Sequence, residues 1–177
     1  MNIVIVKPAG DYYFRADSTL NHKFLDYYCP EAVASLQVTP VLYTRISKTA
    51  KCVAERFAKR YFDSFAFGCL IDDATAGITP AMAVSLDGTC VMGMDFRPVD
   101  DLPRGSFSLR SGGHVLFQTD KAPDASRFAS SIVAVSSRSM MRLGDILALE
   151  LTPASPIERG ETVTLCNCGT EHSFKIF

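Results

Sequence analysis

Two adjacent acidic residues, Asp72 and Asp73, directly follow an apolar run over residues 65–71. The ends of buried strands often carry binding sites, and hard divalent cations take oxygen ligands such as carboxylates. The pair is therefore a candidate for holding a cation or a polar ligand. The competing interpretation is that both acids end the strand and form a turn, which would leave no site there.

A second candidate group is Cys166, Cys168 and His172, which lie close together near the C-terminus. Thiolates and imidazole suit a soft metal such as zinc, but a structural zinc site wants four ligands and the sequence offers no obvious fourth. The simpler interpretation is a pair of ordinary cysteines at a strand end. Glycine-rich phosphate loops, the G-x-S-x-G elbow and H-E-x-x-H do not occur in the sequence.

The composition is that of a globular chain. Of its 177 residues 47% are hydrophobic, and 18 basic against 19 acidic side chains give a net charge of −1. This balance predicts no nucleic-acid binding, and no apolar run approaches the ~18–20 residues that a membrane-spanning helix needs. The N-terminus lacks the features of a signal peptide, so we expect a cytoplasmic protein.

The elements that must position the candidate residues are mostly strands. Hairpin signals are Asp87-Gly88, between 81–86 and 89–94, and Gly112-Gly113, between 107–111 and 114–118. Pro40 lies inside one apolar strand, which predicts an edge position or a bulge there. Strands are expected at 2–6, 36–46, 65–71, 146–152, 162–166 and 172–176, and helices at 49–62 and 124–139. This order lacks the β-α-β alternation of a doubly wound fold, so we expect a mixed β (α+β) architecture.

Several segments, in the right order, resemble the catalytic β-rich domain of the fumarylacetoacetate hydrolase family, short bacterial type. The matching segments are Ile5-Val6-Lys7-Pro8, residues 51–62, Asp73-Ala74-Thr75-Ala76, residues 86–93, residues 107–118, residues 143–146 with Thr152-Pro153, and residues 159–163. The resemblance implies a single domain over residues 1–177, built as a curved β-sheet or β-roll with two peripheral helices. It also implies chemistry on diketo or 2-keto acids, namely hydrolysis, isomerisation or decarboxylation.

In that family a divalent cation, Mg²⁺ or Mn²⁺, is held by a Glu-x-Glu pair and an Asp, and a lysine assists. Here the Glu-x-Glu positions fall on Thr39 and Val41, and the lysine position falls on Val84. The metal Asp falls on Leu70 when counted from Gly68, or on Asp73 when matched through D-x-T-A. The match also begins at the start of this domain, so we expect no counterpart of the histidine and acid that short members carry upstream.

These differences predict a family-like protein that has lost the standard metal-dependent activity and acts as a binding or assembly module. No cofactor is then expected, and the partners would be a second copy, an active paralogue or a small 2-keto acid. The alternative is an active hydrolase, isomerase or decarboxylase whose Mg²⁺ or Mn²⁺ is held by Asp72 and Asp73. The candidate ligand-binding residues are Lys7, Asp72, Asp73, Asp87 and Thr152.

Overall fold

The computed structural model describes residues 1–121 and 124–177 and contains two β-sheets. The larger sheet follows the order β2-β1-β10-β4-β5-β6-β3, with β11 paired to β4 and β7 to β5, and the smaller sheet follows β13-β12-β8-β9. The strands are β1 (Ile3–Val6), β2 (Tyr12–Arg15), β3 (Leu20–Asn21), β4 (Leu36–Arg45), β5 (Ser64–Asp73), β6 (Cys90–Val91), β7 (Arg97–Pro98), β8 (Phe107–Ser111), β9 (His114–Thr119), β10 (Ile146–Glu150), β11 (Ser155–Ile157), β12 (Thr162–Asn167) and β13 (Thr170–Lys175).

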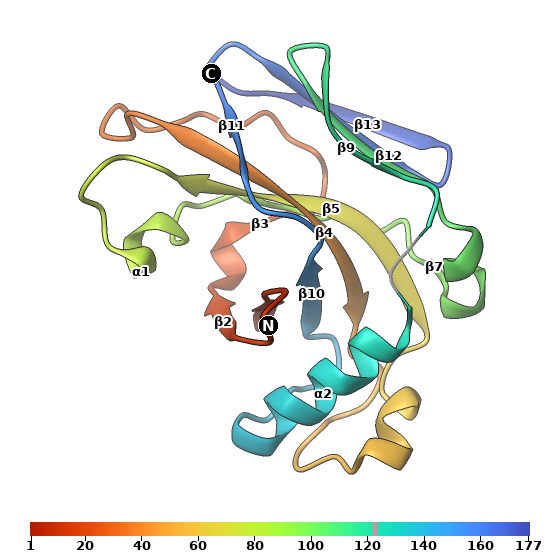
Figure 1. Cartoon of the computed structure of the whole chain (residues 1–177). Helices are drawn as coiled ribbons and strands as arrows, with labels where there is room; N and C mark the ends of the chain where they lie inside the picture. The colour runs from red at the N-terminus through yellow and green to blue at the C-terminus, as the bar shows by residue number, and fades with distance from the viewer. Residues whose placement is uncertain (122–123) are drawn as a thin grey trace.

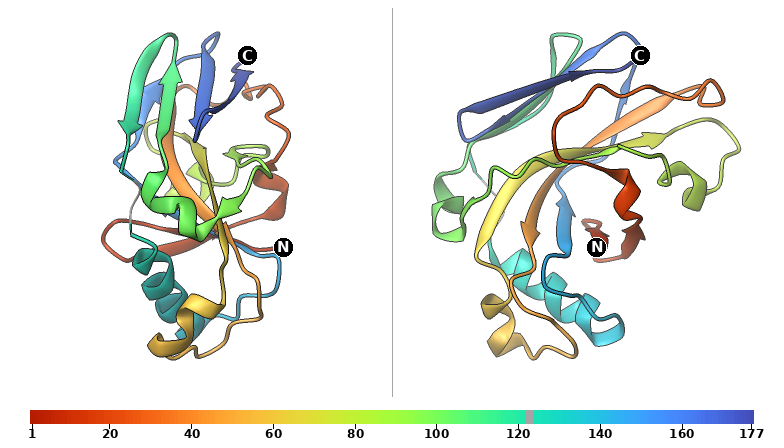
Figure 2. Two further views of the ribbon diagram at one scale, coloured as in Figure 1. Left: turned by 90° about the vertical axis from the view of Figure 1, so that its right-hand side faces the viewer. Right: turned by 180° about the vertical axis from the view of Figure 1, so that it is seen from behind.

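The larger sheet curls into a half-barrel whose longest strands are β4 and β5 (Figure 1). The smaller sheet lies across its outer face, and α2 (Ser126–Arg138) lies below it (Figures 1 and 2). The expected curved sheet of a mixed β fold is confirmed. No described helix is both long enough and apolar enough to cross a membrane.

Both faces of the larger sheet are buried along β4 and β5. Val38 and Leu42 belong to the core that includes the smaller sheet and α2, whereas Val41 and Tyr43 belong to a second core on the concave face. Successive strand residues point to opposite faces, so a strand covered on both sides reads as a continuous apolar run. This explains why residues 65–71 lack the alternation of a half-exposed strand.

The prediction that Pro40 marks an edge strand is wrong for β4 as a whole, because β4 pairs with β5 on one side and with β10 and β11 on the other. The proline lies where β10 has ended at Glu150 and β11 has not yet begun at Ser155. Its carbonyl accepts a hydrogen bond from the Leu151 amide on that side, 3.0 Å away. The missing N–H therefore falls at a break in the neighbouring pairing and leaves no ladder bond unmade.

The predicted helix over 49–62 is also wrong, because only Glu55–Arg60 forms a short 3₁₀ helix. The preceding backbone is held from outside: the Cys52 amide donates to the Ser136 carbonyl at 2.8 Å, and the Val53 amide to Ser136 Oγ at 3.0 Å. These bonds to the end of α2 replace the i→i−4 bonds of a helix. The helix was predicted from apolar side chains at spacings of three and four residues, and the steps of three also suit a 3₁₀ turn.

Of the remaining predictions of secondary structure, some are confirmed and others are wrong. The hairpin at Gly112-Gly113 is confirmed, and both glycines have positive φ. The hairpin at Asp87-Gly88 is wrong: the chain turns there, but it connects α1 (Pro80–Ala83) to the two-residue β6. The second helix is confirmed as α2, with Phe128, Ile132 and Val135 buried. Strands β2, β3, β7 and β11 were not predicted, and two further short 3₁₀ helices are Asp17–Thr19 and Val99–Arg104.

Candidate functional site

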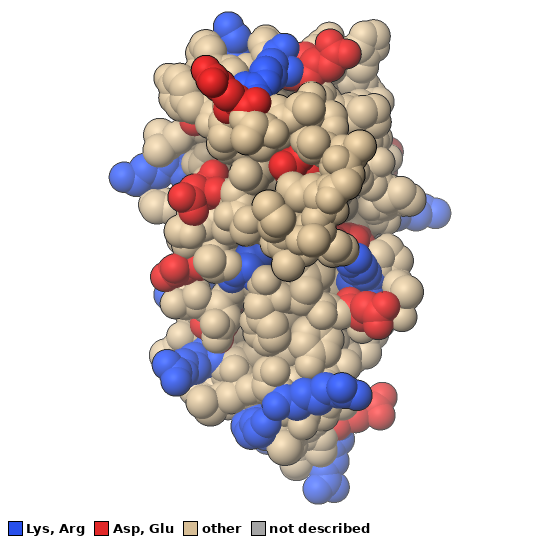
Figure 3. All heavy atoms as spheres, turned by 90° about the vertical axis from the view of Figure 1, so that its left-hand side faces the viewer, with Lys and Arg blue, Asp and Glu red and all other residues tan. Residues whose placement is uncertain are grey.

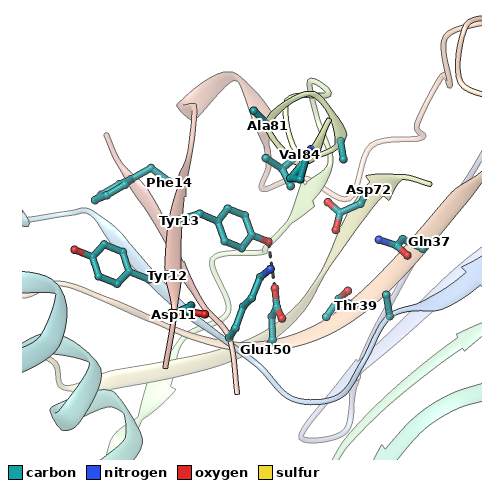
Figure 4. A pocket seen from close by; sticks show the side chains of 14 residues that line it. Asp11, Tyr12, Tyr13, Phe14, Gln37, Thr39, Asp72, Ala81, Val84 and Glu150 are labelled. Carbon is teal, nitrogen blue, oxygen red and sulfur yellow. Dashed lines mark hydrogen bonds between the residues drawn. The ribbon is translucent and has the colours of Figure 1, made fainter. Parts of the chain in front are cut away.

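A pocket of about 640 Å³ opens on the concave side of the curled sheet. Its walls come from β2, β4, β5, α1 and the ends of β1 and β10, and Figure 4 shows Tyr13, Asp72 and Glu150 directed into one space. The polar side chains that line it are Lys7, Asp11, Tyr12, Tyr13, Gln37, Thr39, Asp72 and Glu150. Pockets of this size hold small molecules, so this is the candidate binding site.

Strand register places these side chains on one face. Gln37 lies directly opposite Asp72 across the β4–β5 pair, and Thr39 is two residues further along the same face of β4. Glu150, the last residue of β10, lies opposite Val41. Because the side-chain period of a strand is two, all four point towards the concave side.

Tyr13 and Glu150 form a hydrogen-bonded pair at one wall of the pocket. The Tyr13 hydroxyl donates to Glu150 Oε1 at 3.2 Å (Figure 4). Burial raises the pKa of Tyr13 well above its ordinary value, so the hydroxyl remains a donor. Burial also raises the pKa of Glu150, and the hydrogen bond from Tyr13 opposes this change. The Lys7 ammonium lies 5.5 Å from the centre of the Tyr13 ring.

Asp72 forms an ion pair with Arg15, which reaches it from β2. Arg15 Nη2 donates to Asp72 Oδ1, and Nη1 lies 3.3 Å from Thr89 Oγ1 and 3.5 Å from the Ile71 carbonyl oxygen. The Arg15 side chain is fully buried, and that of Asp72 is 10% exposed. Burial raises the pKa of Asp72, whereas the Arg15 charge lowers it, and a carboxylate in direct contact with a guanidinium stays ionised at neutral pH.

The structure brings together only some of the residues that the sequence suggested. Lys7 and Asp72 line the pocket, but Asp73 points to the opposite face of β5, where its Oδ1 accepts from the Thr75 amide at 2.8 Å. Adjacent strand residues cannot share a face, so Asp72 and Asp73 do not form one site. Asp87 lies at a separate turn, and the Thr152 hydroxyl donates to the Pro153 carbonyl at 3.2 Å, so neither lines this pocket.

Sequence reasoning missed Tyr13, Gln37 and Glu150 among the residues that line the pocket, and it also missed Arg15, which contacts Asp72 from behind the pocket wall. Glu150 had a usable signal, because it ends an apolar strand in the same way that Asp72 ends another. Tyr13 and Arg15 lie on β2, a strand for which the sequence pattern gave no prediction. The ion pair of Arg15 with Asp72 spans 57 residues of sequence, and a local sequence pattern does not predict such a contact.

The soft-metal hypothesis is not supported. His172 Nε2 lies 2.5 Å from Asp95 Oδ2, and its ring stacks on Phe24 with centres 3.9 Å apart. Within residues 1–121 and 124–177, no cluster of three or more His, Cys, Asp or Glu side chains is arranged to hold a metal ion. Cys166 and Cys168 therefore belong to no metal cluster in the part of the chain that the structure describes.

Comparisons with solved structures identify this fold. A scan against protein-family models and a search of curated proteins found no match. Among solved structures, a fumarylacetoacetate hydrolase family protein from Yersinia pestis CO92 superposes with a TM-score of 0.82 at 18% identity, over 99% of this chain and 92% of that one. The chain has the fold of the fumarylacetoacetate hydrolase family.

Two further structures with this fold carry named activities. Fumarylpyruvate hydrolase from Pseudomonas aeruginosa, in complex with Mn²⁺ and pyruvate, has a TM-score of 0.81 at 14% identity, over 99% of this chain and 89% of that one. A 5-carboxymethyl-2-hydroxymuconate delta-isomerase from Mycobacterium smegmatis has the same score and identity, over 99% and 78%. At these identities the likeness establishes the fold, and any functional argument must rest on the pocket's own residues.

Those residues do not fit a divalent cation of the kind seen with the fumarylacetoacetate hydrolase fold. Asp72 is already paired with a guanidinium, and Glu150 accepts from Tyr13. The positions that the resemblance aligned with the Glu-x-Glu pair hold Thr39, which lines the pocket, and Val41, which is fully buried in the concave core. Mg²⁺ and Mn²⁺ prefer anionic or neutral oxygen ligands with no competing cation beside them.

Proposed function

We propose that this protein binds a small carboxylic acid, of the 2-keto or diketo acid class, in the pocket on the concave face, and that it lacks the metal-dependent hydrolase activity of proteins with this fold. The observation that carries the proposal is the buried Arg15–Asp72 ion pair at that pocket. The pair neutralises Asp72 at the pocket, where a metal-dependent enzyme needs free carboxylates.

The pocket offers suitable donors for such a ligand. Lys7 is exposed and forms no ion pair with any described residue, so its ammonium is available to a carboxylate. The Gln37 side chain supplies an amide opposite Asp72. Val84, Ala81 and Ala83 form an apolar wall against which the carbon skeleton of a small acid would pack. A few placed polar groups on an apolar wall are typical of small-molecule sites.

The face of the molecule seen in Figure 3 gives no support to a nucleic-acid partner. On the face shown in Figure 3, which is the left-hand side of Figure 1, basic and acidic side chains are interspersed rather than gathered by sign. The ligand of this pocket is therefore sought among small molecules.

A second candidate is a metal-dependent hydrolase, isomerase or decarboxylase acting on the same class of acids. Two observations favour it: a fumarylpyruvate hydrolase with this fold holds Mn²⁺ and pyruvate, and both Asp72 and Glu150 line the pocket. It requires Asp72 to exchange Arg15 for the cation.

Isothermal titration calorimetry separates the candidates. Chelator-treated protein is titrated with pyruvate or oxalate, with and without Mn²⁺, and compared with Lys7→Met and with the control Lys23→Met, an exposed lysine that does not line the pocket. The proposal predicts binding without Mn²⁺ that Lys7→Met weakens by about tenfold, equal to about 1.4 kcal/mol, and that the control leaves unchanged. Binding only with Mn²⁺ would favour the second candidate, and no binding in either condition would refute both.

A further inference from the structure

Arg15 holds a permanent positive charge against Asp72, behind the wall of the pocket. A guanidinium does not lose its proton in proteins, so it remains charged even when fully buried. Its side chain has no solvent exposure, and its Nε has no hydrogen-bond partner among the described residues. The charge can be neutralised only by its neighbours, and Asp72 is the carboxylate in contact with it.

The curl of the sheet is what brings this charge to Asp72. Arg15 belongs to β2, the first strand in the sheet order, and Asp72 belongs to β5, with β1, β10 and β4 between them. Arg15 and Tyr13 are two residues apart and share the concave face of β2, so Arg15 spans the inside of the half-barrel rather than pairing along the sheet. Its contacts with Thr89 and the Ile71 carbonyl fix the guanidinium beside β5.

We infer that the Arg15 guanidinium neutralises Asp72 from behind the pocket wall and so occupies the carboxylate that a divalent ion would need as a ligand. This inference rests on the proposed function, because it explains how an acidic ligand is accepted beside Asp72. One guanidinium and one carboxylate sum to zero charge, so Asp72 offers a divalent ion a ligand whose charge is already neutralised, and the other carboxylates that line the pocket are Glu150 and Asp11. Arg15 acts through Asp72 and is a positioning residue, since its buried atoms do not line the pocket.

The strand register indicates how the opposite arrangement can be built. Gln37 lies directly opposite Asp72 and Thr39 lies diagonally to it, so glutamates at 37 and 39 would surround Asp72 with carboxylates. These carboxylates are expected to bind Mn²⁺ once Arg15 is removed, because the competing charge is then gone. While Arg15 is present, its guanidinium attracts the new carboxylates and repels the metal ion.

The test measures Mn²⁺ binding directly, by electron paramagnetic resonance of free Mn²⁺. It compares the wild type, the double variant Gln37→Glu/Thr39→Glu, and a triple variant that adds Arg15→Met to the two glutamates. The charge-matched control adds Arg110→Met to the two glutamates instead, because Arg110 lies on the exposed face of β8. We expect millimolar or weaker Mn²⁺ binding by the wild type, by the double variant and by the Arg110→Met control. The triple variant with Arg15→Met should bind Mn²⁺ at least tenfold more tightly. Circular dichroism shows whether each variant is folded, and Arg15→Lys, which keeps the charge, should give no gain.

Two results would overturn the inference. One is micromolar Mn²⁺ binding by the wild type that Asp72→Asn abolishes, a measurement that needs no Arg15 variant to fold. The other is equal Mn²⁺ affinity of the glutamate variants with Arg15 and with Met at position 15. Failure of the proposed function looks different, because the wild type would then bind neither pyruvate nor oxalate while still rejecting Mn²⁺.

Discussion

Removing one partner of the Arg15–Asp72 pair should destabilise the protein far more than removing both. The side chains are 0% and 10% exposed, so either single loss leaves a charge buried without compensation. Such losses cost about 3–5 kcal/mol, a large part of the 5–15 kcal/mol that typically separates folded from unfolded protein. For a chain of this size the melting temperature should fall by about 6–20 °C.

The two single variants should also differ from each other. Asp72→Leu leaves a guanidinium that cannot lose its proton, whereas Arg15→Met leaves a carboxyl that can take one up, so the cost of Arg15→Met should shrink as the pH falls. The double variant Arg15→Met/Asp72→Leu should recover most of the lost stability, because apolar pairs replace buried ion pairs well. Urea denaturation of the four proteins gives the coupling energy, and additive costs within about 0.5 kcal/mol would refute the reasoning.

Three further predictions concern the stability of the fold. Burial raises the folded-state pKa of Glu150 above its ordinary value of 4.5. The contribution of Glu150 to stability is therefore complete below pH 4.5 and is lost as the pH rises through the folded pKa. Between pH 4 and pH 8, the urea midpoint of Glu150→Gln should rise relative to that of the wild type. Gly68→Ala would place a Cβ 2.4 Å from the Val91 carbonyl oxygen and should cost about 1–3 kcal/mol in the same assay. Arg159 donates to three backbone carbonyls of residues 29–33 at 2.7–2.9 Å, so Arg159→Ala should cost about 1–2 kcal/mol and speed proteolysis of that segment.

Much of the fold could be predicted from local sequence, because burial leaves a local signature. The apolar runs of β4 and β5 and the Gly112-Gly113 hairpin each have a cause within a few residues. The segment 49–62 shows where this fails: its side-chain spacing suits a helix, but its backbone hydrogen bonds go to Ser136 at the end of α2. A partner 83 residues away cannot be read from a local pattern.

The residues of the site could likewise be predicted only where the signal is local. Asp72 could be predicted because it ends a buried strand, but its separation from Asp73 depends on which face of β5 each occupies. The resemblance matched Asp73 through the D-x-T-A motif, whereas the structure places Asp72 in the pocket. Arg15 could not be predicted as a site residue, because its role depends on how far the whole sheet curls.

The order of the pocket groups follows the order of the strands: Tyr13 on β2, Lys7 after β1, Glu150 on β10, Thr39 on β4 and Asp72 on β5. Apart from Tyr13, which packs against the concave core, none of these pocket residues belongs to either core, and solved structures at 14–18% identity share the fold. A buried ion pair is also a costly way to close a sheet, because a well-packed apolar pair would serve at least as well. If the double variant Arg15→Met/Asp72→Leu is as stable as the wild type but no longer binds pyruvate or oxalate, the pair serves the ligand and not the fold. Equal acid binding by both proteins would assign it to the architecture alone.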